Sequence, residues 1–186
     1  MRHVQPPLEH CCTRLLFVGQ RLDAWKAFAG SEISCDEIGC LIRVVIERGS
    51  DALVEIISRN KLAANFEVRV VEALRYVLAM VLHVSVIEHS AGSTVETTLI
   101  SPVRASETHL LPPLMASSSN DRPNVRRLFE RYLTFVHSQI SSEFVHPCSS
   151  HLRMACEASA NAIEAEAIGL CVAVEGIAKL VPYDRS

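Results

Sequence analysis

Apolar and polar side chains alternate in two short runs, at positions 41–46 and 53–57. Alternation with a period of two is typical of a β-strand that buries one face. Gly49 and Ser50 lie between the two runs, and a glycine at the first central position of a type II′ turn supplies the positive φ that this turn needs. The two runs therefore predict a β-hairpin.

The spacing of the apolar side chains changes after this hairpin. Between residues 65 and 80 they recur every three or four positions, which predicts a helix, and Asn65 is placed to cap its start. Alternation returns at 84–87 and continues in the Thr-rich stretch 94–100, which predicts a second hairpin. The order hairpin, helix, hairpin predicts an α+β fold in which the helix packs across one face of an antiparallel sheet.

The last third of the chain carries two helical stripes. The first runs through residues 125–141, and a short turn around His146 and Pro147 then leads into a long final helix. The final helix has an apolar seam with alternating steps of four and three, formed by Ile163, Ala167, Leu170, Val174, Ile177 and Val181. We therefore predict a C-terminal pair of long helices. We expect the seam to be covered by earlier parts of the chain or by a partner.

These patterns divide the chain into three parts. Residues 1–100 form the predicted α+β domain, although residues 1–40 show no clear period and 14–28 fits either a short helix or a strand followed by a turn. Residues 101–124 are rich in proline and serine, which predicts a linker or a long surface loop. Residues 125–186 are predicted to form a helical hairpin or the start of a truncated helical domain.

Composition narrows the possible function classes. Hydrophobic residues make up 49% of the 186 residues and the mean hydropathy is +0.22, which indicates a chain that buries a core. The formal net charge of −3 provides no general basic surface, so we do not expect nucleic-acid binding. No apolar run is long enough for a signal-peptide core or a membrane span, so we expect a cytoplasmic protein. The seven cysteines include no Cys-x-x-Cys motif, which predicts free thiols.

One pair of side chains matches the pattern Arg, five residues, His that a class of helical ribonucleases uses. The pair is Arg131 and His137. Six residues correspond to a rotation of about 240° around a helix, so the two side chains lie on different faces and a second chain would have to complete a site. We therefore predict no catalytic residue in this chain.

A second group of side chains combines imidazoles and thiols, the usual zinc ligands, just before and within the final helical region. It comprises His146, Cys148, His151 and Cys156, and the spacing matches no common zinc site. The chain also contains no Gly-rich phosphate-binding loop. We therefore predict neither a metal site nor a cofactor.

Several phrases of the sequence are similar to the middle part of bacterial HEPN-domain proteins of the ApeA-like kind, which are linked to anti-phage defence. The phrases are VEALRYVLA at 71–79, LFERYL at 128–133, EAEA at 164–167 and AVEGI at 173–177, and the resemblance spans about 41–181. In such proteins a β-rich sensing region precedes a helical HEPN domain that cleaves RNA, commonly as a dimer. The resemblance implies a comparable order of regions here.

The resemblance also implies what this chain lacks. The final helix would correspond to an early helix of the HEPN domain, whereas the Arg and His motif of the family lies in a later helix. The resemblance therefore implies no catalytic role for Arg131 or His137. We expect a naturally short relative, a truncated reading frame, or a subunit that another chain completes.

These observations lead to three hypotheses about function. The first is a non-catalytic sensing or protein-interaction domain, in which a second copy or a partner chain covers an interface formed by Ile163, Leu170, Val174, Ile177 and Val181. The second is a HEPN-like ribonuclease that acts as a dimer. The third is a small zinc-binding module.

Overall fold

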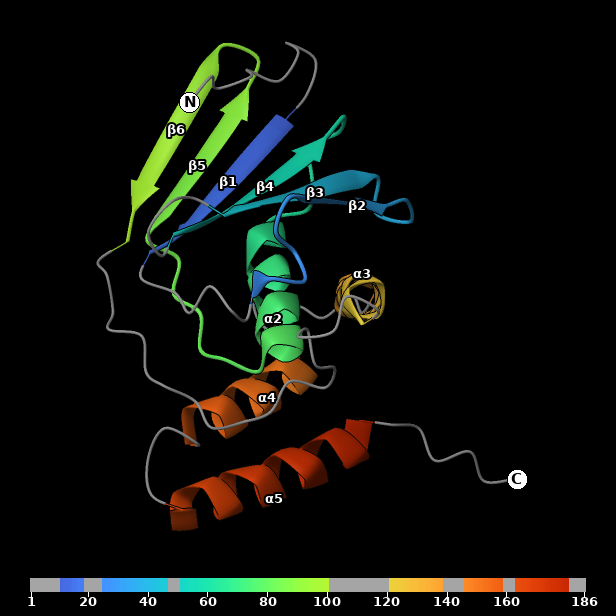
Figure 1. Cartoon of the computed structure of the whole chain (residues 1–186), viewed down its shortest axis with the longest axis vertical. Coiled ribbons are helices and arrows are strands. Elements are labelled where there is room, and N and C mark those ends of the chain that lie inside the picture. Colours follow the sequence, from blue (N-terminus) through green and yellow to red (C-terminus); the bar gives the residue numbers. More distant parts are fainter. Residues whose placement is uncertain are drawn as a thin grey trace.

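The computed structural model describes residues 11–18, 25–46, 51–100, 121–138, 146–158 and 163–180. In this part of the chain the strands form one six-stranded antiparallel sheet, and helices lie below one of its faces (Figure 1). The strands are β1 (Cys11–Phe17), β2 (Ser31–Cys35), β3 (Cys40–Ile46), β4 (Ala52–Ser58), β5 (Val86–Ala91) and β6 (Thr94–Leu99). Their order across the sheet is β2-β3-β4-β1-β5-β6. The predicted α+β class is confirmed.

Both predicted hairpins are present, as β3–β4 and β5–β6. In the first, Ile46 pairs with Ala52, so residues 47–51 connect the strands. A two-residue turn at Gly49 and Ser50 would pair the two strands one residue out of the observed register. The turn itself lies outside the described residues. The odd number of connecting residues keeps the apolar side chains of both strands on the same face of the sheet.

Within the first forty residues, the described part contains β1, β2 and a turn between them. β1 occupies a central position between β4 and β5, although it comes first in the chain. A turn over residues 25–30 then leads into β2, which forms a tight hairpin with β3. Gly39 ends the hairpin loop with a φ of 77°, a conformation that favours glycine. Of the stretch 14–28, residues 14–17 belong to β1 and 26–28 lie in a turn, while 19–24 lie outside the described residues.

The predicted central helix is α2 (Phe66–Leu78), which packs against one face of the sheet. Asn65 precedes it in a left-handed conformation with a φ of 62°, and its side chain makes no capping hydrogen bond. The predicted cap is therefore wrong, since capping side chains normally extend from a backbone in the β region. Ala79, also left-handed, ends the helix.

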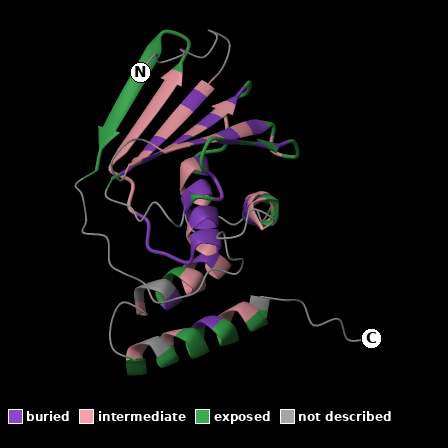
Figure 2. Ribbon diagram, viewed as in Figure 1, coloured by how far each residue is buried: buried purple, intermediate pink, exposed green. Residues whose placement is uncertain are grey.

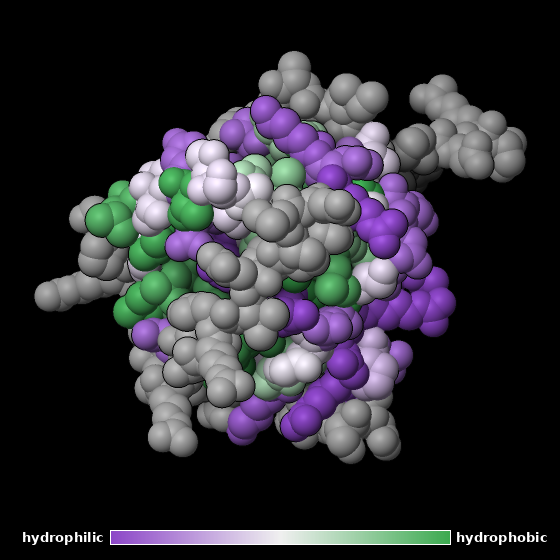
Figure 3. All heavy atoms as spheres, turned by 90° about the horizontal axis from the view of Figure 1, so that it is seen from above, coloured by the Kyte–Doolittle hydropathy of each residue, from purple (hydrophilic) through white to green (hydrophobic). Residues whose placement is uncertain are grey.

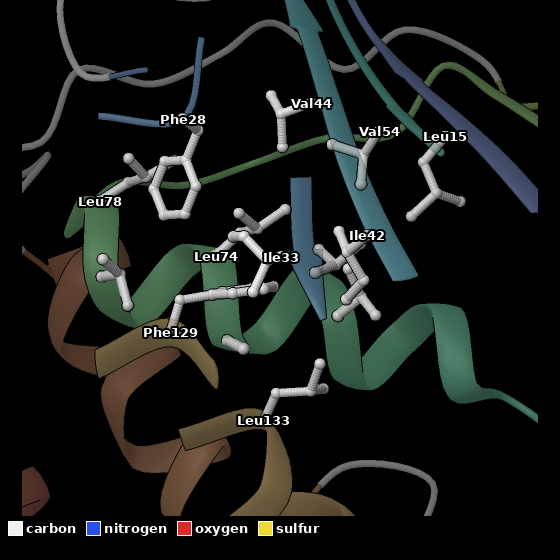
Figure 4. Close-up of a cluster of buried hydrophobic side chains, with 14 of the residues drawn as sticks. Leu15, Phe28, Ile33, Ile42, Val44, Val54, Leu74, Leu78, Phe129 and Leu133 are labelled. Atoms are coloured by element: carbon white, nitrogen blue, oxygen red, sulfur yellow. The ribbon is translucent and has the colours of Figure 1, made fainter. Parts of the chain in front are cut away.

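The main hydrophobic core lies between the sheet, α2 and α3 (Arg122–Ser138). Side chains from these three sources point toward one another, including Leu15 from β1, Leu74 from α2 and Phe129 from α3 (Figure 4). Phe129 is fully buried and meets Phe28 edge to face, with 5.6 Å between ring centroids. The helix predicted after residue 124 thus completes the same core as the sheet.

The chain after α3 contains two helices where the sequence predicted one long helix. They are α4 (Pro147–Ala158) and α5 (Ile163–Leu180), and they lie side by side below the core (Figure 1). In the described part of the C-terminal region, three helices, α3, α4 and α5, therefore take the place of the predicted pair. Among the described residues, no helix combines the length and the apolar character that crossing a bilayer requires.

Candidate functional site

The contact between α4 and α5 uses small side chains. Ala173 of α5 is buried, with 4% of its surface exposed. A Cβ atom added to Gly169 would lie 2.6 Å from the Cβ of Ala158, and one added to Gly176 would overlap the ring of His151. Small residues thus allow the two helices to approach closely, and they define the face of α5 that points toward α4.

The predicted apolar seam lies mainly on the solvent side of α5. Ile163 is 81% exposed and Val174 67% exposed, while Leu170 is exposed to a smaller extent and Ile177 is half-buried (Figure 2). Val181 lies outside the described residues. No other described element covers this face, since α4 packs on the small residues. The interface prediction itself stays a prediction.

Further apolar side chains of α5 are exposed beside the seam. Ile168 is 66% exposed and Val172 is 41% exposed, and Met154 of the neighbouring α4 is 45% exposed. Charged side chains are few, and Glu175 forms an i,i+4 ion pair of 2.7 Å with Lys179. A helix that is apolar around most of its circumference is normally buried. α5 therefore exposes to solvent an apolar surface of the kind that is normally buried.

The two ribonuclease-type residues lie in different environments. Arg131 is exposed on α3, whereas His137 is half-buried with its ring edge-on to Phe66, at 5.4 Å between centroids. Burial lowers the pKa of His137, and the positive charge of Arg69 lowers it further. His137 is therefore a packed histidine whose surroundings disfavour its charged form, and the structure does not place it in a site with Arg131.

The proposed zinc ligands have structural roles where the structure describes them. The Nδ1 atom of His146 accepts a hydrogen bond of 3.2 Å from the backbone N–H of Cys148, which caps the start of α4. His151 lies against α5 at Gly176, and the side chain of Cys156 lies outside the described part. Among the described residues, no three His, Cys, Asp or Glu side chains are grouped closely enough to hold a metal ion.

A buried polar cluster joins α4 to the core. The hydroxyl groups of Tyr132 and Ser149 lie 3.1 Å apart, and Tyr132 stacks on Tyr76 at 4.3 Å. Glu72 of α2 reaches toward Ser149 and the backbone of His146, but neither carboxylate oxygen has a well-formed hydrogen bond to a described residue. Burial raises the pKa of Glu72, and these neighbours oppose the rise only in part.

The face of the sheet opposite the helices carries a row of alternating charges. The row crosses five strands in the order Glu32, Arg43, Glu55, Arg14 and Glu88, with nitrogen to oxygen distances between 2.7 and 3.4 Å. Seen from the sheet side, hydrophilic and hydrophobic side chains are interleaved (Figure 3). The paired charges stabilise the strand register and leave no free reactive group in this row.

A cavity of about 500 Å³ lies where the opposite, helix-facing side of the sheet extends beyond α2. Its polar centre is a row of side chains from three neighbouring strands, Thr13 of β1, His89 of β5 and Glu96 of β6. The Thr13 hydroxyl lies 2.9 Å from Nδ1 of His89. Lys61, from the segment before α2, and Glu67, in the first turn of α2, contribute charged groups.

This cavity is not among the sites predicted from the sequence. Its polar row joins residues that are 76 positions apart, and only the pairing of β1 with β5 brings them together. One signal was present in β6, where the polar side chains Thr94, Glu96 and Thr98 alternate with Val95 and Leu99. The register places these polar side chains on the helix-facing side, the reverse of what a simple core would need.

The resemblance to HEPN-domain proteins finds no independent support in comparisons with other proteins. No protein-family model matches this chain, and neither a curated protein nor a solved structure shows significant similarity to it.

Proposed function

We propose that this chain is a non-catalytic interaction domain that associates with a second copy of itself through the exposed face of α5. The observation that carries the proposal is the division of α5 into two faces. Gly169, Ala173 and Gly176 face α4, while Ile163 and Val174 face solvent. Covering a fully exposed Val or Ile side chain contributes about 1.5–3 kcal/mol, so an uncovered face of this kind favours association.

The spacing of the seam favours a second copy as the partner. Steps of four and three residues are the pattern by which helices of the same kind pack side by side, with knobs on one helix filling holes on the other. A two-fold dimer brings the same surface of both copies together, so one self-complementary seam is sufficient. The ion pair between Glu175 and Lys179 neutralises two of the four charged side chains of α5.

The association can be tested by measuring molar mass with light scattering over a range of concentrations. We expect a dimer that Val174→Asp converts to monomer, because a buried unpaired charge is costly in an apolar interface. Val95→Asp is the matched control, since Val95 is an exposed valine of β6, 59% exposed against 67% for Val174. The control variant should remain dimeric.

Two results would contradict the proposal. The first is a parent chain that stays monomeric at every concentration. The second is a dimer that Val95→Asp disrupts and Val174→Asp does not, which would place the interface on the sheet. The membership in a defence family and the cytoplasmic location stay predictions. The ribonuclease alternative also stays a prediction, and the half-buried position of His137 lends it no support.

A further inference from the structure

We propose that the cavity between β1, β5, β6 and the start of α2 binds a small organic molecule with an apolar body and a protonated amine. The cavity lies on the helix-facing side of the sheet, and no described residue of α4 or α5 lines it. Its volume of about 500 Å³ is within the usual range of small-molecule pockets, roughly 300–1,000 Å³. The proposal goes beyond the association through α5 and does not depend on it.

The apolar part of the lining fits the body of such a molecule. Ile56 of β4 and Phe66 of α2 continue the main core into the cavity, and Leu62, Ala63 and Ala64 line it from the segment before α2. These side chains offer no hydrogen-bonding group. Ile56 and Phe66 are already buried, whereas Leu62 is half-buried and Ala63 and Ala64 are exposed. An aromatic or branched aliphatic body would exclude water from these last three residues and gain from their burial.

The polar row lies where the sheet would otherwise continue its core. The register aligns Ile42, Ile56, Thr13, His89 and Glu96 on one face, so the row changes from fully buried isoleucines to polar groups. Thr13 and His89 are half-buried and Glu96 is exposed, so their polar groups can be reached by a bound molecule. A polar head group in the cavity can therefore hydrogen-bond to this row.

The hydrogen bond between Thr13 and His89 orients the imidazole ring. It occupies Nδ1, and Nε2 has no hydrogen-bond partner among the described residues. Glu96 lies directly opposite His89 on the neighbouring strand. A ligand head group placed beside Nε2 would therefore also be near a carboxylate.

The charges of the lining favour a cation over an anion. The described lining has two carboxylates, Glu67 and Glu96, against one ammonium, Lys61. Neither carboxylate forms an ion pair with a described residue. A protonated amine would supply the missing charge and donate hydrogen bonds to Glu96, whereas a ligand carboxylate would be repelled.

Three probes of nearly the same size can test the choice of head group. Phenylethylamine is cationic, phenylethanol is neutral and phenylpropionate is anionic. Titration of the full chain with each probe, followed by two-dimensional amide NMR, should show shifts at Thr13, His89 and Glu96. We expect affinities in about the millimolar range, with the amine binding roughly tenfold more tightly than the alcohol and the acid binding most weakly.

The variant Glu96→Gln tests whether the carboxylate of Glu96 binds the amine. It keeps the size of an exposed edge-strand side chain, so the fold is preserved, and it should reduce binding of phenylethylamine to that of phenylethanol. Glu37→Gln, at an exposed glutamate of the β2–β3 turn, is the control and should change nothing. The proposal is overturned by equal binding of the acid and the amine, by shifts that map outside the cavity, by the absence of shifts for every probe, or by an unchanged preference in Glu96→Gln.

Discussion

The unit formed by the sheet, α2 and α3 differs from the α4–α5 hairpin in how apolar side chains are covered. In the first, large side chains such as Phe28, Leu74 and Phe129 interlock and are fully buried. In the second, α5 contacts α4 through glycine and alanine, and Ile163 and Val174 remain exposed. Both regions are rich in apolar residues, so composition alone does not separate them. What separates them is whether another element of the same chain faces the large side chains.

The largest expected difference between the two regions concerns the core. Phe129→Ala should lower the free energy of unfolding by about 3–5 kcal/mol, because it leaves a cavity among fully buried neighbours. Phe135→Ala, in the same helix at a residue 42% exposed, should cost only about 1 kcal/mol. Urea denaturation monitored by circular dichroism measures both values. Similar losses in the two variants would show that α3 does not complete the core as described.

A smaller effect is expected where the hairpin is packed most closely. Gly169→Ala gains about 1 kcal/mol of helix propensity, but its Cβ would lie 2.6 Å from that of Ala158, and such overlap costs roughly 1–3 kcal/mol. The expected net result is a modest loss of protection from amide hydrogen exchange in α4 and α5. Gly176→Ala should lose less, since the ring of His151 can rotate away. Greater protection in Gly169→Ala than in the parent would contradict the close approach.

The smallest effect is expected at Glu72, which connects the two regions. Because burial raises its pKa above the ordinary value of 4.5, the folded chain holds a proton at pH values where the unfolded chain has released it. The free energy of unfolding therefore falls as the pH rises from about 4.5 through the folded-state pKa, and it stays lower above that point. The ionised carboxylate faces Ser149, the His146 backbone and the guanidinium groups of Arg69 and Arg75, which soften this loss.

Glu72→Gln keeps the shape of the side chain and removes its titration. We expect the variant to be more stable than the parent at neutral pH, and the difference to disappear as the pH falls toward 4.5. Urea titrations at several pH values measure the slope. A parent whose stability rises over this window at the same rate as that of the variant would show that Glu72 is not held in a desolvated site.

Local patterns predicted those elements whose apolar side chains repeat within one segment. The β3–β4 and β5–β6 hairpins, α2 and α3 were all predicted in this way and are present. β1 was only one of two interpretations of 14–28 and β2 was not predicted, because their partners β4, β5 and β3 lie elsewhere in the chain and their own alternation is short. The break between α4 and α5 was also missed, since the residues from 147 to 180 carry a nearly continuous helical period.

The candidate sites divide in the same way. The seam from Ile163 to Ile177 could be predicted from the sequence, because a helical repeat depends only on neighbouring residues. The exposure of the seam could not be predicted, since it depends on which face of α5 contacts α4. The row of Thr13, His89 and Glu96 could not be predicted from the sequence, because its side chains become neighbours only when three strands pair in one register.

The sequence by itself thus determined the local periods, the fold class and the existence of an apolar face on the final helix, all of which follow from side-chain spacing along one element. Only the tertiary structure decided which apolar faces are covered and which polar side chains meet in a cavity. The physical reason is that burial and hydrogen bonding depend on contacts between distant segments. The same apolar helix can be core or surface according to what packs against it.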